Sequence, residues 1–273
     1  QYHIKRGDLK RTKVIVPDSA HGTNPASAAV CGLEIVEVPS TPEGTIDVTK
    51  LEPLLDDTIA GIMMTNPNTL GIFEKEIPQI AELVHGCGGL LYYDGANLNP
   101  LLGRCRPGDM GFDIMHINLH KTFSTPHGGG GPGVGPICVA EHLVPFLPGH
   151  GLFGNSQNEV SAAPFGSAGI LPITYGYIRM MGTEGLTRAT KTAILNANYL
   201  AACFKDTYGI VYRGATGFVG HEMILECRKV HEETGISEND IAKRLMDYGY
   251  HAPTLSFPVH GTLMIEPTES ESL

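Results

Sequence analysis

The stretch GLLYYDGAN, residues 89–97, decides the fold class of this chain, and the stretch IMHINLHK, residues 114–121, repeats its pattern. Each is a short apolar run that ends abruptly in polar residues, as a fully buried strand does. Segments with helical spacing lie between several such runs. Buried strands that alternate with helices predict an α/β fold, built on a mostly parallel sheet with helices on both faces. The other apolar runs are residues 14–16, 34–38, 60–64 and 136–139.

Polar or glycine-rich turns follow four of the predicted strands. Ligand sites in parallel sheets gather at the carboxyl ends of the strands, because those ends meet at one edge of the sheet. We therefore expect the residues of these turns to form one site. The turns are Asp18–His21, Thr65–Asn68, Asp94–Asn97 and Asn118–Lys121.

A second, smaller domain is expected after residues 148–167, which are rich in glycine, proline, serine and asparagine. The predicted division is a large domain over residues 1–150 and a small α+β domain over residues 151–273. Both read as incomplete, because the chain starts at Gln1 without an initiator methionine and stops just after a strand-like run. Expected elements of the second half are helices over 173–181 and 184–205, a strand pair at 210–212 and 222–225, a helix from Ser237 to Tyr248, and a strand at 262–265.

Charge and cysteine content narrow the class of protein. The formal net charge of −10 argues against nucleic acid as a partner, since phosphate backbones call for a basic face. The six cysteines form no CxxC pair, which favours reduced thiols in a reducing compartment. Without an apolar run of membrane-spanning length or a signal peptide, we expect no membrane partner and a cytoplasmic location, or the mitochondrial matrix in a eukaryote.

Lys121 and Asp94 carry the chemistry that the sequence suggests. Lys121 follows a predicted strand and precedes the glycine-rich loop at residues 126–133, and Asp94 ends the strand before it. A lysine amine can bind the aldehyde of pyridoxal phosphate (PLP) covalently, and a carboxylate can keep the pyridine nitrogen of that cofactor protonated. We expect Lys121 to be buried, since burial lowers the pKa of an amine and makes it a better nucleophile.

Several motifs resemble those of one family, the glycine cleavage system P-proteins. They are HGTNPA at residues 21–26, TNPNTLG at 65–71, YYDGAN at 92–97, the His120-Lys121 loop, SAAPFGSA at 161–168 and IEPTES at 265–270. The resemblance spans the chain and corresponds to the carboxyl-terminal catalytic portion of that family. It implies the PLP-dependent transferase fold of type I.

The resemblance also implies roles for individual residues around the cofactor. Lys121 and Asp94 would act as described, with Lys121, His21 and Asp94 as the catalytic residues. His21 would stack on the cofactor ring, Ala96 would pack on that ring, and Asn97 would hydrogen-bond its phenolic oxygen.

Two further side chains are expected to bind the cofactor phosphate. Asn118 and His120 stand two apart on a strand-like segment, so both would lie on one side of it, just before the lysine. The alternative is that they only support the loop. No metal site is expected, because His116, His120 and His127 share no carboxylate or cysteine at a ligand spacing.

The reaction that the resemblance implies is decarboxylation of glycine, with transfer of the aminomethyl group to the lipoyl group of the H-protein. A homodimer or an oligomer of related subunits is expected. Two other interpretations stay open. One is another fold-type-I enzyme, such as a class-V aminotransferase or a cysteine desulfurase-like protein, and the other is a catalytically silent supporting half. Since no phosphate-binding loop precedes the first strand, we expect this chain alone to bind PLP weakly and to lack full activity.

Overall fold

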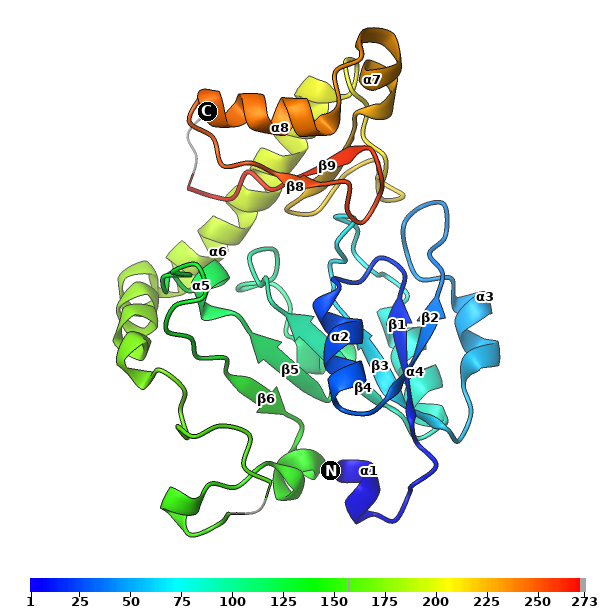
Figure 1. The fold of residues 1–273 in the computed structure, drawn as a ribbon, viewed down its shortest axis with the longest axis vertical. Helices are drawn as coiled ribbons and strands as arrows, with labels where there is room; N and C mark the ends of the chain where they lie inside the picture. Colours follow the sequence, from blue (N-terminus) through cyan, green and yellow to red (C-terminus); the bar gives the residue numbers. More distant parts are fainter. Residues whose placement is uncertain (157, 271–273) are drawn as a thin grey trace.

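The computed structural model describes residues 1–156 and 158–270, and its main feature is a six-stranded sheet (Figure 1). The strand order is β2-β1-β3-β4-β5-β6. All neighbouring pairs are parallel except β5 and β6, which pair antiparallel. This confirms the predicted α/β class. The strands are β1 (Lys13–Pro17), β2 (Glu34–Val38), β3 (Ile59–Met64), β4 (Leu90–Gly95), β5 (Ile114–Ile117) and β6 (Ile137–Val139).

Helix α4 packs against this sheet through an apolar stripe. In α4 the buried side chains recur at helical spacing and join the main hydrophobic core with Ile62 and Leu91 of the sheet. The segments with helical spacing between the apolar runs correspond to α2, to the short α3 continued by a 3-10 turn, and to α4. The helical elements of this half are α1 (Tyr2–Lys5), α2 (Thr23–Val30), α3 (Val48–Leu51), η1 (Glu52–Leu54), α4 (Ile77–Gly86), η2 (Pro107–Met110), α5 (Leu119–Thr122) and η3 (Glu141–Phe146).

A long helical stretch, α6 (Leu171–Phe204), joins the two halves of the chain. Gly182 interrupts it with non-helical angles (φ 58°, ψ −176°), so the two predicted helices exist and meet there. Tyr177 of the first part packs on the core of the large sheet, while Ala197 and Ala201 of the second part are buried in the second core. The predicted division at residue 150 stays a prediction. Two short 3-10 turns precede this helix, η4 (Gly151–Phe153) and η5 (Ala168–Ile170).

The second half folds around a three-stranded sheet of order β7-β9-β8. The predicted strand pair is wrong in part. Ile210 forms only an isolated bridge with Leu225, and β7 pairs along its length with β9. The predicted helix after Ser237 is confirmed, with Ser237 and Asp240 forming a reciprocal capping box. The elements are β7 (Met223–Glu226), α7 (Arg228–Thr234), α8 (Glu238–Asp247), β8 (Thr254–Leu255) and β9 (Thr262–Ile265).

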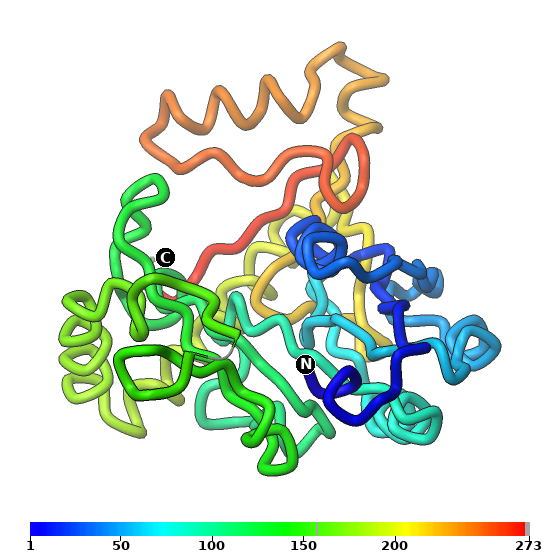
Figure 2. The backbone as a smooth tube through the Cα atoms, turned by 60° about the horizontal axis from the view of Figure 1, so that its bottom comes forward, coloured from blue at the N-terminus to red at the C-terminus, as the bar shows by residue number. Residues whose placement is uncertain are grey.

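The second sheet lies over the loops at the carboxyl ends of the large sheet. The Gly71 carbonyl accepts a hydrogen bond from the Gly220 N–H (2.7 Å). Gly71 has a φ of 78°, and a Cβ added there would collide with the Glu222 carbonyl oxygen, so this contact requires glycine. In both views α7 and α8 lie on the outer side of the second sheet, away from the large one (Figures 1 and 2). The two halves therefore meet where the sequence predicts the site.

Two general expectations can be checked on the described residues. All six cysteines are free, in agreement with the reduced state predicted from their spacing. Within residues 1–156 and 158–270, none of the helices combines the length and apolar character needed to cross a bilayer.

Candidate active site

Asp94 is a buried carboxylate at the carboxyl end of β4. Its Oδ1 accepts a hydrogen bond from the Ala96 N–H (3.0 Å) and lies 3.3 Å from Nε2 of His116. His116 is the direct partner of Asp94 across the β4–β5 pair. A Cβ at Gly95 would collide with the His116 carbonyl oxygen, so this glycine permits the close approach of the two strands. The register of two neighbouring strands thus creates the Asp94–His116 contact.

Lys121 lies four residues after β5, in the single helical turn α5. Asn118 has extended angles as the N-cap of that turn (φ −91°, ψ 105°), which ends the strand and starts the helix. Lys121 raises the electrostatic potential at His116 and thereby helps to lower its pKa. The side chain of Lys121 is exposed, so the expected burial of this amine is wrong for the described residues. Because β4 and β5 are parallel neighbours, Lys121 and Asp94 lie at the same edge of the sheet.

Asn118 and His120 differ from their predicted arrangement. They do not share the side of a strand, since β5 ends at Ile117 and His120 belongs to the helical turn. The His120 ring packs edge-on against His127 at 4.8 Å between centroids. Both rings line a cavity of about 190 Å³ together with Gly130–Gly133. The pKa of His120 is lowered by partial burial and by its neighbours His127 and Lys121.

His21 stands at the entrance to α2, two residues before its first residue. Its Nδ1 accepts a hydrogen bond from the Thr23 N–H (3.1 Å), and its exposed ring packs edge-on against Phe257 (6.0 Å between centroids). Phe257 belongs to the second half of the chain, so His21 lies at the junction of the two halves. Its stacking role stays a prediction.

Asn97 connects the loop after β4 to the second half. Its Nδ2 donates to Oε1 of Glu266 (2.7 Å), and its Oδ1 accepts from the Asn99 N–H (3.0 Å). One amide hydrogen of Asn97 stays available for another acceptor. The predicted contacts of Asn97 and Ala96 with the cofactor stay predictions.

His116 is a site residue that was not predicted from the sequence, where it was considered only as a metal ligand. Its Nδ1 is 2.7 Å from the Tyr92 hydroxyl, and the two rings are stacked. Burial lowers the pKa of His116, the charge of Asp94 raises it, and the charge of Lys121 lowers it further. Burial also raises the pKa of Tyr92 to about 12, with a smaller contribution from Asp94. The signal in the sequence is the period-2 spacing, which places Tyr92 and Asp94 on one face of β4.

A second missed group consists of His221, Glu222 and Glu266 from the second half. His221 Nε2 lies 3.9 Å from a Glu222 oxygen and 3.8 Å from Glu266 Oε1. One ligand-type atom of each residue lies within 4.8 Å of the others, which is the kind of grouping that can hold a metal ion. Burial raises the pKa of Glu222 well above its usual range, and the nearby Glu266 raises it further. Glu266 belongs to the IEPTES motif at residues 265–270, and this motif was the only feature of the sequence that pointed to a role for the group.

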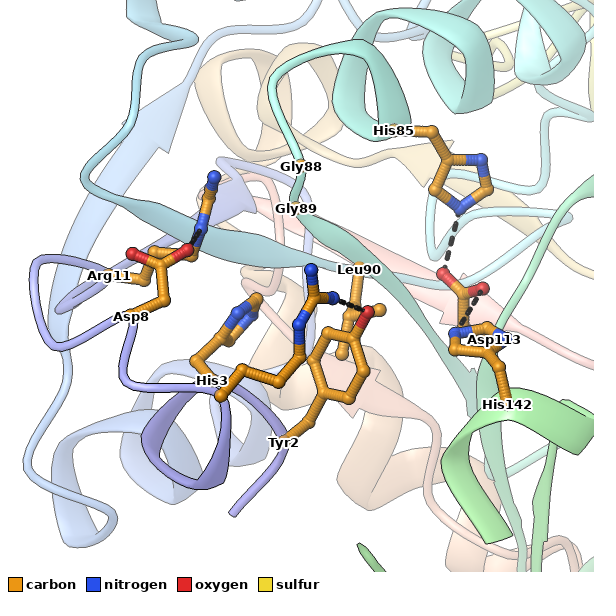
Figure 3. Close-up of a pocket in the computed structure, with 11 residues that line it drawn as sticks. Tyr2, His3, Asp8, Arg11, His85, Gly88, Gly89, Leu90, Asp113 and His142 are labelled. Atoms are coloured by element: carbon orange, nitrogen blue, oxygen red, sulfur yellow. Dashed lines mark hydrogen bonds and ion pairs between the residues drawn. The ribbon is translucent and has the colours of Figure 1, made fainter. Parts of the chain in front are cut away.

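A cavity of about 310 Å³ lies elsewhere, around the amino ends of β4 and β5 (Figure 3). Its charged groups are engaged with one another. Arg11 binds Asp8 (2.5 Å) and two carbonyl oxygens, and His85 Nε2 lies 2.8 Å from Asp113. These contacts hold the segment after α1 against the large sheet. Among the described residues that line this cavity, there is no lysine amine near an unpaired carboxylate.

The groups at the carboxyl edge fit the chemistry of pyridoxal phosphate. Asp94 is a buried carboxylate, and among the described residues no cationic lysine or arginine lies within ion-pair distance of it. A protonated heterocycle would supply that missing positive charge. Lys121 offers an accessible amine at the same edge of the sheet, and His120 offers a donor beside a glycine-rich loop.

Two family models match the chain. One, described as aminotransferase class-V, covers residues 4–163, which is more than half of the chain. The other, described as the glycine dehydrogenase C-terminal domain, covers residues 189–273.

Similar curated proteins are considerably longer than this chain. Glycine dehydrogenase (decarboxylating) of Bacteroides fragilis is 73% identical over 270 residues, a region that covers 98% of this chain and 28% of that protein. The protein of the same name from Bartonella henselae is 57% identical and is covered over 29% of its length. The chain therefore spans less than a third of the length of these relatives.

Solved structures share the fold at low sequence identity. Glycine decarboxylase (P-protein) of the glycine cleavage system, in inhibitor-bound form, superposes with a TM-score of 0.77 at 20% identity, covering 98% of this chain and 63% of that one. A cysteine desulfurase from Thermococcus onnurineus superposes with a TM-score of 0.69 at 16% identity, covering 96% of this chain and 69% of that one. At these identities the likeness shows the fold, that of PLP enzymes of fold type I.

Proposed function

The chain belongs to the aminotransferase class-V family, and from that premise we propose that it forms the catalytic portion of a PLP-dependent glycine dehydrogenase (decarboxylating). The family depends on PLP. The name of the activity comes from relatives at 57% and 73% identity. The proposed reaction is decarboxylation of glycine, with transfer of the aminomethyl group to the lipoyl group of an H-protein.

The observation that carries this proposal is the placement of Lys121 and Asp94 at one edge of the sheet. They follow neighbouring parallel strands, and both act on the same residue between them, His116. A carboxylate that forms no ion pair with a lysine or arginine, and an accessible amine at the same edge of the sheet, are the two groups that PLP chemistry needs. The cofactor supplies an electron sink for the bond that breaks.

Different residues of the chain would hold the aldehyde, the ring and the phosphate of the cofactor. Lys121 would hold the cofactor aldehyde through its amine, and Asp94 would bind the protonated ring nitrogen with the oxygen that the chain leaves free. His120 and Asn118 would contact the phosphate, and His120 already lines a cavity with the glycine-rich loop. His21, which lies on Phe257 at the junction of the halves, would cover the cofactor ring.

The remaining proposals concern partners and location. Glycine offers only an amine and a carboxylate, so a small site between the two halves suffices for it. We propose the lipoylated H-protein as the acceptor, a homodimer or an oligomer of related subunits as the assembly, and the cytoplasm as the location, since the relatives named above are bacterial.

The test uses the complete natural polypeptide that contains this chain. We expect PLP to give a visible absorbance that borohydride removes, and mass spectrometry to find the reduced cofactor on the peptide that contains Lys121. Lys121→Ala should lose that label and lower the exchange of glycine with bicarbonate in the presence of lipoylated H-protein by at least about a thousandfold. Lys75→Ala, at an exposed lysine far along the chain, is the matched control.

Labelling of a different lysine would contradict the proposed role of Lys121. Cofactor binding without any glycine–bicarbonate exchange would instead favour another enzyme of the same fold. The cysteine desulfurase-like alternative would then be tested by supplying cysteine and measuring sulfide.

A further inference from the structure

We propose that His116, held in one tautomer by its contacts with Asp94 and Tyr92, is a positioning residue that fixes the Asp94 carboxylate in the orientation that receives the cofactor ring. This inference rests on the proposed function and deepens it. It adds to the site two side chains, Tyr92 and His116, that reach the cofactor only through Asp94.

The two oxygens of Asp94 have different surroundings. Oδ1 accepts the Ala96 N–H at 3.0 Å and faces His116 Nε2 at 3.3 Å. Among the described residues, Oδ2 takes part in no hydrogen bond or ion pair. Two partners on one oxygen fix the rotation of the carboxylate about its Cβ–Cγ bond. Oδ2 is therefore the oxygen left for a ligand, and a protonated pyridine nitrogen is the ligand that the proposed function supplies.

The Asp94 carboxylate favours a proton on Nε2 of His116, and Tyr92 can donate to Nδ1 in that tautomer. Its hydroxyl lies 2.7 Å from Nδ1, and the His116 ring is stacked on the tyrosine ring with 26° between the planes. If Nδ1 carried the proton, the lone pair of Nε2 would face the Asp94 carboxylate, which is repulsive. If Tyr92 donates to Nδ1, Nε2 carries the proton and faces Asp94 Oδ1 with it at 3.3 Å, so the charges of the two groups attract.

The same polar contacts keep the charge of Asp94 available. The charged and titratable groups that face His116 are Tyr92 and Asp94 on β4 and Lys121 on α5, and its partner on β6 is the apolar Ile137. Burial and Lys121 lower the pKa of His116 against the opposing effect of Asp94, so the ring is neutral near pH 7. A neutral ring donates to the carboxylate without neutralising it.

Acid should undo this arrangement. When His116 gains a second proton, Nδ1 can no longer accept from Tyr92, and the imidazolium competes with the pyridinium for the charge of Asp94. The affinity for PLP is therefore expected to fall as the pH falls through the pKa of His116.

The experiment measures the dissociation constant of PLP in the complete natural polypeptide between about pH 5 and pH 9. His116→Leu should weaken binding about tenfold at pH 8, the effect of one lost polar contact with a charged group. His116→Gln, whose amide can donate to Asp94 and accept from Tyr92, should bind PLP within about twofold of wild type. It should also remove the fall in affinity at low pH, here called the acid limb. Tyr92→Phe should move that limb to higher pH, because Nδ1 is then free to take a proton.

His85→Gln is the matched control, since His85 Nε2 also pairs with an aspartate, Asp113 at 2.8 Å, at the opposite ends of the strands. It should leave both the affinity and the pH profile unchanged. The proposal is overturned if wild type binds PLP but His116→Leu and His116→Gln bind it equally well, or if the acid limb persists in His116→Gln. A wild-type protein that binds no PLP would overturn the proposed function itself.

A second measurement does not depend on the variants folding. In the complete polypeptide labelled with ¹⁵N-histidine and free of PLP, His116 should show a protonated Nε2 and an unprotonated Nδ1 near pH 7. The opposite tautomer would overturn the proposal.

Discussion

Glu74 provides the sharpest prediction for stability, because its carboxyl group is almost fully buried (1% exposed). It accepts hydrogen bonds from the Ile46 N–H (3.0 Å) and from Asn68 Nδ2 (2.7 Å). Those partners lower its pKa, but burial dominates and raises the pKa from 4.5 to about 7. Asn68 belongs to the TNPNTLG segment, so Glu74 supports a loop at the carboxyl edge of the sheet.

The sign of the pH effect follows from this shift. A carboxyl group with a raised pKa is protonated more readily in the folded protein than in the unfolded chain. Its contribution to stability is therefore fully present below about pH 4.5 and is lost as the pH rises through about 7. A shift of about 2.5 units corresponds to about 3 kcal/mol between the two limits.

Glu74→Gln should remove this dependence. Glutamine keeps the acceptor for Asn68 but offers an N–H to the Ile46 N–H, and that mismatch costs about 1 kcal/mol. Near pH 8 we expect the variant to be about 2 kcal/mol more stable than wild type, and near pH 5 slightly less stable. Urea denaturation at several pH values measures both free energies of unfolding. Glu82→Gln, at an exposed glutamate of α4, is the control. A variant that is less stable than wild type at both pH values would refute the reasoning.

Two further predictions concern the junction of the halves. Gly71→Ala should destabilise the protein by about 2 kcal/mol or more, because Gly71 has a positive φ and its new Cβ would collide with the Glu222 carbonyl. Thermal unfolding measures this loss, and an unchanged melting temperature would contradict it. Glu266→Leu should weaken PLP binding about threefold to tenfold by releasing Asn97, whereas Glu266→Gln, which keeps the acceptor oxygen, should stay near wild type; equal affinities of the two variants in a titration would argue against this role.

Local pattern was sufficient for the large sheet and for the residues that end its strands. Buried strands such as β4 must be continuously apolar and must stop at polar residues, so residues 89–97 and 114–117 could be recognised from sequence. The same applies to the capped helix after Ser237, whose start depends only on residues three positions apart.

Contacts between distant residues were decided only by the tertiary structure. The alignment of Asp94 with His116 depends on the register of two strands, which the residues between them do not reveal. The Asn97–Glu266 hydrogen bond joins residues 169 positions apart. The helical turn α5 separates Asn118 from His120 and leaves Lys121 exposed. It could not be recognised from the sequence, because four residues are too few to show a helical repeat. The sequence alone determined which side chains reach the carboxyl edge of the sheet, since strand ends are local features. Which of those side chains touch one another was decided by packing, because register and the docking of the two halves depend on the whole chain.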